Sequence, residues 1–204
     1  RSTLFPYTTL FRSRDDTVIH CPLDLTTLYG AGRETAYRPK DPTLMSPEVN
    51  VIHGDLHGCV YGGGYGATAT TQANPVVNIG YNAETMSDLI PAGFDASTAY
   101  ASANHIYGGG EMAPIVGSPS VNITKTNTLI LGSVYGGGSG SNTDVNGALV
   151  QGNDTVRIMG GTINRNVFGG GSLASVTGDT WVELSGGEVN KDVYGGGEGV
   201  SEEN

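Results

Sequence analysis

The sequence predicts an all-β fold, an elongated parallel β-solenoid of about five to six coils, from three observations. Glycine supplies 33 of the 204 residues, about twice the usual share, which disfavours a helical bundle. A block of one aromatic residue and three glycines recurs along the chain, and a short apolar–x–apolar segment precedes it. The glycines do not recur at every third position, which excludes a collagen helix.

The first repeated element is Val or Ile, then an aromatic residue, then three glycines. Its aromatic residues are Tyr61, Tyr107, Tyr135, Phe168 and Tyr194, and a degenerate copy surrounds Tyr29. The glycines predicted as structural corners are Gly62, Gly63, Gly64, Gly136, Gly137, Gly138, Gly169, Gly170, Gly171, Gly195, Gly196 and Gly197. Glycine reaches positive φ without a steric clash, so a corner residue such as Gly170 is a candidate for that conformation. A flexible, silk-like tract is the alternative. A phosphate-binding loop is disfavoured, because none of the triplets is followed by the Lys-Ser/Thr pair that such a loop needs.

The second repeated element is a strand in which two apolar residues flank a polar one. Its copies are Val49-Asn50-Val51, Val77-Asn78-Ile79, Val121-Asn122-Ile123, Val156-Arg157-Ile158 and Val182-Glu183-Leu184. This alternation directs the apolar side chains to one face and the polar one to the other. The Gly-Gly pairs that follow the last two copies predict a second corner. One unit cannot bury its own apolar face, so we expect stability to come from stacking.

The chain divides into four predicted parts. Residues 1–13 are expected to be non-native, because residues 3–13 resemble the in-frame translation of a sequencing adapter. Residues 14–48 form an irregular N-terminal region with the degenerate coil, and residues 49–200 carry the solenoid repeats, with insertions near 81–104 and 139–154. Residues 201–204 are a truncated end. Both ends are expected to be cut, as in a fragment of a longer gene assembled from metagenomic DNA.

Two sets of residues are candidate binding sites. The aromatic row forms either a buried, stacked ladder or an exposed strip that binds sugars. His53, Asp55, His57 and Cys59 carry zinc-type ligands and would share one face of an extended strand. Neighbours in that set would be about 6.6–7 Å apart, so four could not converge on a metal without a bend. A solvated face is the alternative for this cluster.

Charge and composition exclude several classes of function. The net charge of −10 argues against binding to nucleic acid, where cations must neutralise phosphates, and against anionic membrane surfaces. No run of 18 apolar residues is present, so we expect no membrane insertion. Acidic residues are scattered, and residues 41–124 contain no Lys or Arg, which disfavours acid–base chemistry on polysaccharides. We therefore predict no catalytic residues and no cofactor.

The Val-Tyr-Gly-Gly-Gly and Val-x-Ile-x-Gly-Gly-x-Ile repeats resemble the Gly-rich β-strand-repeat, adhesin-like surface proteins of gut-type bacteria. The resemblance covers roughly residues 15–200 and transfers no catalytic residues. It implies secretion, display on the bacterial cell surface, and contact with glycans or proteins of host or neighbour cells. It also implies packing against adjacent coils of the same longer chain. The expected function is a non-enzymatic extracellular structural or adhesive stalk, and the alternative is a carbohydrate-binding or polysaccharide-processing β-helix.

Overall fold

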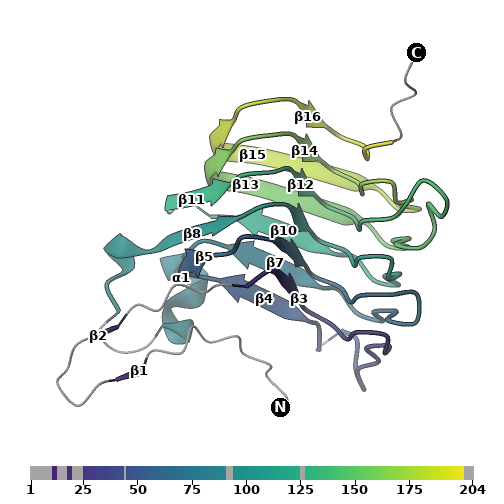
Figure 1. Ribbon diagram of the computed structural model, residues 1–204, viewed down its shortest axis with the longest axis horizontal. Coiled ribbons are helices and arrows are strands. Elements are labelled where there is room, and N and C mark those ends of the chain that lie inside the picture. Colours follow the sequence, from purple (N-terminus) through teal and green to yellow (C-terminus); the bar gives the residue numbers. More distant parts are fainter. Residues whose placement is uncertain are drawn as a thin grey trace.

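The computed structural model describes residues 25–43, 45–90, 94–124 and 127–199, together with two short antiparallel strands, β1 (Phe11–Arg12) and β2 (Val18–Ile19). The rest of the predicted adapter segment and residues 201–204 lie outside the described residues. Among the described residues, strands account for 41% and helices for 6%, so this part of the protein is mostly β. The strands of successive repeats lie over one another from β4 to β15 (Figure 1).

The larger sheet has eight strands, and all its pairs are parallel. Its members are β4 (Glu48–Val51), β5 (Gly54–Asp55), β7 (Val76–Ile79), β8 (Tyr100–Ala103), β10 (Ser120–Ile123), β11 (Asn127–Ile130), β13 (Asp154–Ile163) and β15 (Thr180–Val189). The strand order is β4-β7-β10-β13-β11-β8-β5, with β15 also paired to β13. β13 pairs with β10 through its first half and with β11 through its second, while β15 pairs with it along its whole length, so the columns β4-β7-β10 and β5-β8-β11 lie on one edge of β13 and β15 lies on the other.

The smaller sheet holds the aromatic block of each repeat. Its six parallel strands are β3 (Thr27–Tyr29), β6 (Cys59–Tyr61), β9 (Ile106–Tyr107), β12 (Val134–Tyr135), β14 (Val167–Phe168) and β16 (Val193–Tyr194). Each aromatic residue pairs with the aromatic residue of the neighbouring strand. This sheet therefore places the rings in one row along the stack.

The predicted fold class, an elongated parallel β-solenoid, is wrong for this architecture. The strands gather into two parallel sheets, one nearly barrel-like, and the arrangement is of an α/β type rather than a clear β-solenoid. The sequence predicts a corner at Gly160 and Gly161 that ends the preceding strand. In the structure β13 runs through both glycines as one ten-residue strand. The bend is absorbed by register shifts after Ile158 and Met159 and by a positive φ of 79° at Gly161.

The core lies between the sheets and is built by rows of aliphatic side chains. Val49, Val77, Val121 and Val156 are aligned by the strand register and are buried. The polar residue between the apolar pair faces outward, where Asn122 Nδ2 donates to Asn78 Oδ1 at 2.8 Å. Asn78 Nδ2 donates in turn to Asn50 Oδ1 at 2.8 Å. Each repeat thus buries its apolar face against its neighbours and links its polar face to theirs.

The glycine triplets allow close approach between repeats rather than positive φ. Among the described residues, positive φ at glycine occurs at Gly54, Gly66, Gly80, Gly161 and Gly187. The hypothesis of positive φ at Gly170 is therefore wrong. A Cβ atom at Gly170 would lie 3.0 Å from the backbone nitrogen of Gly197, and one at Gly136 would lie 2.2 Å from the carbonyl oxygen of Gly169. A side chain at these positions would separate adjacent repeats.

The predicted insertion at residues 81–104 contains all the described helical turns: α1 (Ala83–Met86), η1 (Ser87–Leu89) and η2 (Ala96–Thr98). The side chain of Asn82 caps α1 by accepting a hydrogen bond from the Glu84 N–H, as N-cap residues do. Tyr81 and Met86 pack in a small apolar cluster separate from the main core. The insertion also supplies strand β8 to the larger sheet. Within the described part of the chain, no helix has the length and apolar character needed to cross a membrane.

Candidate binding site

The aromatic residues form one continuous stack of rings. From Tyr29 to Tyr194 the successive ring centroids are 5.1, 4.7, 4.7, 5.0 and 4.9 Å apart, and no two neighbouring rings deviate from parallel by more than 10°. The inner four, Tyr61, Tyr107, Tyr135 and Phe168, are buried. A sugar stacks on the face of an aromatic ring, and here neighbouring rings cover both faces of each inner ring. The arrangement is therefore suited to packing, and among the described residues the terminal rings, Tyr29 and Tyr194, each stack on one ring of the row.

Two glutamates accept hydrogen bonds from phenols of this row. Tyr135 Oη donates to Glu198 Oε2 at 2.6 Å, Ser172 Oγ donates to the same oxygen at 3.0 Å, and Tyr29 Oη donates to Glu111 Oε2. Burial, reinforced by the Glu198 carboxylate, raises the pKa of Tyr135 to about 12. Both glutamates directly follow a glycine triplet, a position for which no role was predicted from the sequence. The phenol stays protonated at neutral pH and acts as a structural donor.

The predicted metal cluster is not brought together. Among the described residues, no three His, Cys, Asp or Glu side chains are placed to hold a metal ion. His53 Nδ1 instead accepts from the Tyr100 N–H at 3.2 Å, and Asp55 Oδ1 accepts from Ser102 Oγ. Asp55 and His57 are exposed, whereas Cys59 is half-buried against the rings. Burial raises the pKa of the Cys59 thiol, which disfavours the thiolate that binds metals.

A buried carboxylate lies within the core. Asp154 begins β13 and is fully inaccessible to solvent, and neither of its carboxylate oxygens has a hydrogen-bond partner. Its side chain lies close to Gly136 and Gly137 of the preceding repeat. Burial without a compensating donor raises the pKa of Asp154 to about 8, so the group is mostly neutral at pH 7. Its position inside the core excludes it from a surface site.

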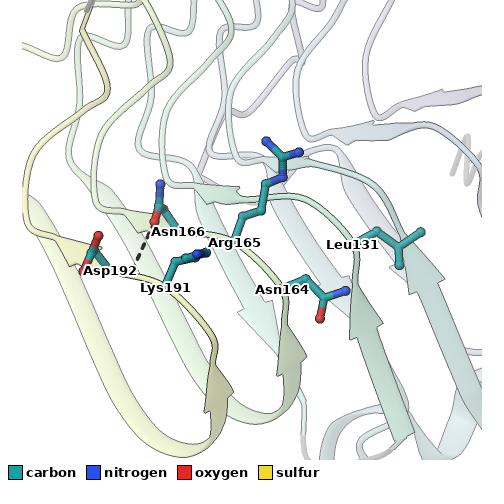
Figure 2. Close-up of a pocket in the computed structure, with 6 residues that line it drawn as sticks. All are labelled: Leu131, Asn164, Arg165, Asn166, Lys191 and Asp192. Atoms are coloured by element: carbon teal, nitrogen blue, oxygen red, sulfur yellow. Dashed lines mark hydrogen bonds between the residues drawn. The ribbon is translucent and has the colours of Figure 1, made fainter.

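A surface pocket of about 430 Å³ lies at the turns that join the two sheets (Figure 2). It is lined by Leu131, Asn164, Arg165, Asn166, Lys191 and Asp192. One turn, residues 164–166, connects β13 to β14, and the equivalent turn, residues 190–192, connects β15 to β16. Leu131 follows β11 in the preceding repeat. The pocket therefore combines three successive repeats.

Hydrogen bonds between neighbouring repeats fix the two turns. Asn190 Nδ2 donates to Asn164 Oδ1 at 3.2 Å, and the Asp192 N–H donates to Asn166 Oδ1 at 3.1 Å, the contact drawn in Figure 2. The backbone N–H groups of Asn164 and Asn190 donate to carbonyls of the neighbouring repeat at 2.8 and 2.9 Å. The pocket is thus held by backbone and amide contacts that leave its two cationic side chains uninvolved.

The pocket concentrates positive charge in an acidic protein. Of the other described cations, Arg157 Nε lies 3.5 Å from Glu183 Oε2, and Arg33 lies over the ring of Tyr65. Arg165 and Lys191 are exposed, and neither makes an ion pair with a described residue. Nearby His105 has its pKa lowered by burial and by the charge of Arg165, so it is neutral at pH 7. Two cations and one carboxylate, that of Asp192, leave the pocket with a net positive charge.

This pocket was not predicted from the sequence, although the sequence carries a signal for it. The last two repeats read Ile163-Asn164-Arg165-Asn166-Val167-Phe168 and Val189-Asn190-Lys191-Asp192-Val193-Tyr194, with a cation after Asn at the same offset. Aligned repeats place such residues side by side. In comparisons with known proteins, the chain matches no family model, no curated protein and no solved structure.

Proposed function

We propose that this chain is a non-enzymatic, extracellular structural and adhesive module of a bacterial surface protein. One observation supports this most: the valine, asparagine and ring rows run through successive repeats and leave sequence variation to the turns and insertions. Binding residues are often carried on variable loops that a rigid scaffold positions. The pocket at residues 164–166 and 190–192 is such a place. Its partners would be glycans or proteins of host or neighbour cells.

Catalysis on polysaccharides is the less favoured function. Cleavage of a glycosidic bond by general acid–base chemistry uses a pair of carboxyl groups across the scissile bond. The pocket is lined by one carboxylate, Asp192. The buried carboxyl of Asp154 lies in the core, where a polymer could not reach it. The geometry therefore favours binding over turnover.

A cell-binding assay tests the proposal. Fluorescently labelled chain is titrated onto bacterial and epithelial cells, with excess unlabelled chain as competitor and a protein of similar size and net charge as control. We expect saturable, competable binding to at least one cell type. Binding no greater than that of the control protein would reject an adhesive function. Release of reducing ends from plant or host polysaccharides would reject the non-enzymatic part.

A further inference from the structure

We propose that the pocket at residues 164–166 and 190–192 binds an acidic sugar through its carboxylate. This inference rests on the proposed function, because it names the class of ligand that the adhesive surface would hold. Its anchor is the juxtaposition of Arg165 and Lys191. The hydrogen bond between Asn164 and Asn190 shows that the two turns are in register, so the cations that follow these residues occupy equivalent positions on adjacent repeats.

The charge of the pocket selects a singly charged anion. The backbones of the two turns follow adjacent strands, which are about 4.8 Å apart, so the long side chains of Arg165 and Lys191 can both reach one anion bound in the pocket. Asp192 already supplies one negative charge, and its Oδ2 accepts from Tyr194 Oη at 3.2 Å. The remaining charge of about +1 matches one carboxylate better than a doubly charged phosphate monoester. A guanidinium can also bind a carboxylate through two parallel hydrogen bonds.

The amides of the pocket supply donors for sugar hydroxyls. The Asp192 N–H can only donate, so Asn166 must present its oxygen there, and its NH₂ group points elsewhere. Asn164 also presents its oxygen to the neighbouring turn, where it accepts from Asn190 Nδ2. Among the described residues, no acceptor lies within hydrogen-bond distance of either NH₂ group. Both amides therefore keep two donors each for a ligand rich in hydroxyl groups.

The remaining wall and the size of the pocket also fit a sugar. Leu131 is 46% exposed and lies across the pocket from Asp192 (Figure 2). An exposed aliphatic side chain beside polar groups can pack against the C–H face of a pyranose ring. The volume of about 430 Å³ lies within the range of small-molecule sites, about 300–1,000 Å³. Cations, amide donors and an apolar wall thus meet in one place.

Calorimetric titration of the whole chain tests the assignment. The probes are a tetragalacturonate, a sialyllactose, and the carboxyl-reduced form of the tetragalacturonate. We expect at least one acidic probe to bind, with a Kd weakened at least about tenfold in Arg165→Gln and in Lys191→Gln. The matched control is Arg157→Gln, a cation of the same strand region outside the pocket, for which affinity should be unchanged. Circular dichroism confirms that all three variants are folded.

The outcomes separate the two acidic sources and the two proposals. Binding of the uronate alone or of the sialoside alone identifies the source of the carboxylate. Equal binding of the carboxyl-reduced probe, equal binding by a variant that carries both Arg165→Gln and Lys191→Gln, or no binding of either acidic probe at millimolar concentration would overturn the inference. If the chain binds cells but neither acidic probe, the inference fails while the adhesive function stands. If the pocket binds acidic sugar but no cell type is bound, the reverse holds.

Discussion

The fourth and fifth repeats place the same residue pattern in different surroundings. Val167 and Phe168 of β14 are 0% and 5% exposed, whereas Val193 and Tyr194 of β16 are 40% and 45% exposed. The two strands pair directly with each other, so their local structure is the same. β14 has a neighbour on each side, and β16 has one on a single side among the described residues. Burial in this protein is thus a property of neighbouring repeats, as in other repeat proteins.

Replacing the buried ring should have the largest effect on stability. Phe168 stacks between Tyr135 and Tyr194 at 5.0 and 4.9 Å. Phe168→Ala removes both ring contacts and leaves a cavity, so we expect a loss of about 3–5 kcal/mol in the free energy of unfolding. Tyr194→Ala removes one contact from an exposed ring and should cost about 1 kcal/mol. Urea unfolding of both variants measures the difference, and equal losses would contradict the comparison.

The first glycine of a triplet gives a second comparison between an inner repeat and the last one. A Cβ atom at Gly136 would lie 2.2 Å from the carbonyl oxygen of Gly169, whereas one at Gly195 would meet nothing within 4 Å. Gly136→Ala must push the adjacent repeats apart, at a cost of about 1–3 kcal/mol. Gly195→Ala should be neutral or stabilise slightly, because alanine restricts the unfolded chain. A neutral Gly136→Ala in thermal unfolding would support the flexible-tract alternative.

The sequence predicts which residues of successive repeats are aligned, but not how neighbouring strands shape the path of the chain. The copies of the Val-x-Ile strand align Val49, Val77, Val121, Val156 and Val182, and these residues are paired in the structure. Periodicity in the sequence is sufficient for that register. It does not determine whether a Gly-Gly pair ends a strand or bends it. That depends on whether the partner strand continues, as β11 does beside the second half of β13.

The pocket was harder to predict because its residues are ordinary in isolation. Arg165 and Lys191 are single surface cations 26 positions apart in the sequence. They become a site only when the repeats align and the amides of Asn164 and Asn166 fix the turns. The prediction of a metal cluster was wrong for the opposite reason. Its residues are close in sequence, but His53 and Asp55 have hydrogen-bond partners in the insertion, at Tyr100 and Ser102.

A third comparison is between Asp154 and the uncharged residue at the equivalent position of the last repeat, because, of the two, only Asp154 makes stability depend on pH. It pairs with Thr180 of the last repeat, which is half-buried and uncharged. The pKa of Asp154 in the folded protein, about 8, exceeds the value of about 3.9 for an unfolded chain. The folded state therefore binds the proton more tightly, and its stability falls as pH rises from about 4 to about 8.

The slope from this group has an upper limit of about 1.4 kcal/mol per pH unit. Asp154→Asn keeps the shape of the side chain and removes the titration. The difference in unfolding free energy between the protein and this variant should therefore grow between pH 5 and pH 8 in favour of the variant, and then level off. Chemical denaturation at four pH values measures it. Parallel pH curves for the two proteins would show that Asp154 has an ordinary pKa.

The smallest effect is expected at the ion pair that joins β13 to the last repeat. Arg157 Nε lies 3.5 Å from Glu183 Oε2, with side chains 44% and 50% exposed. Exposed pairs of this kind contribute about 0.2–1 kcal/mol, and salt screens them. Glu183→Gln should therefore change the free energy of unfolding by less than about 0.5 kcal/mol, and added salt should remove the difference. The valine and ring rows that cross the same junction bury apolar area, which salt does not screen. If Glu183→Gln cost as much as Phe168→Ala, the last repeat would be held by charge, and the contrast between buried and terminal rings would no longer explain its stability.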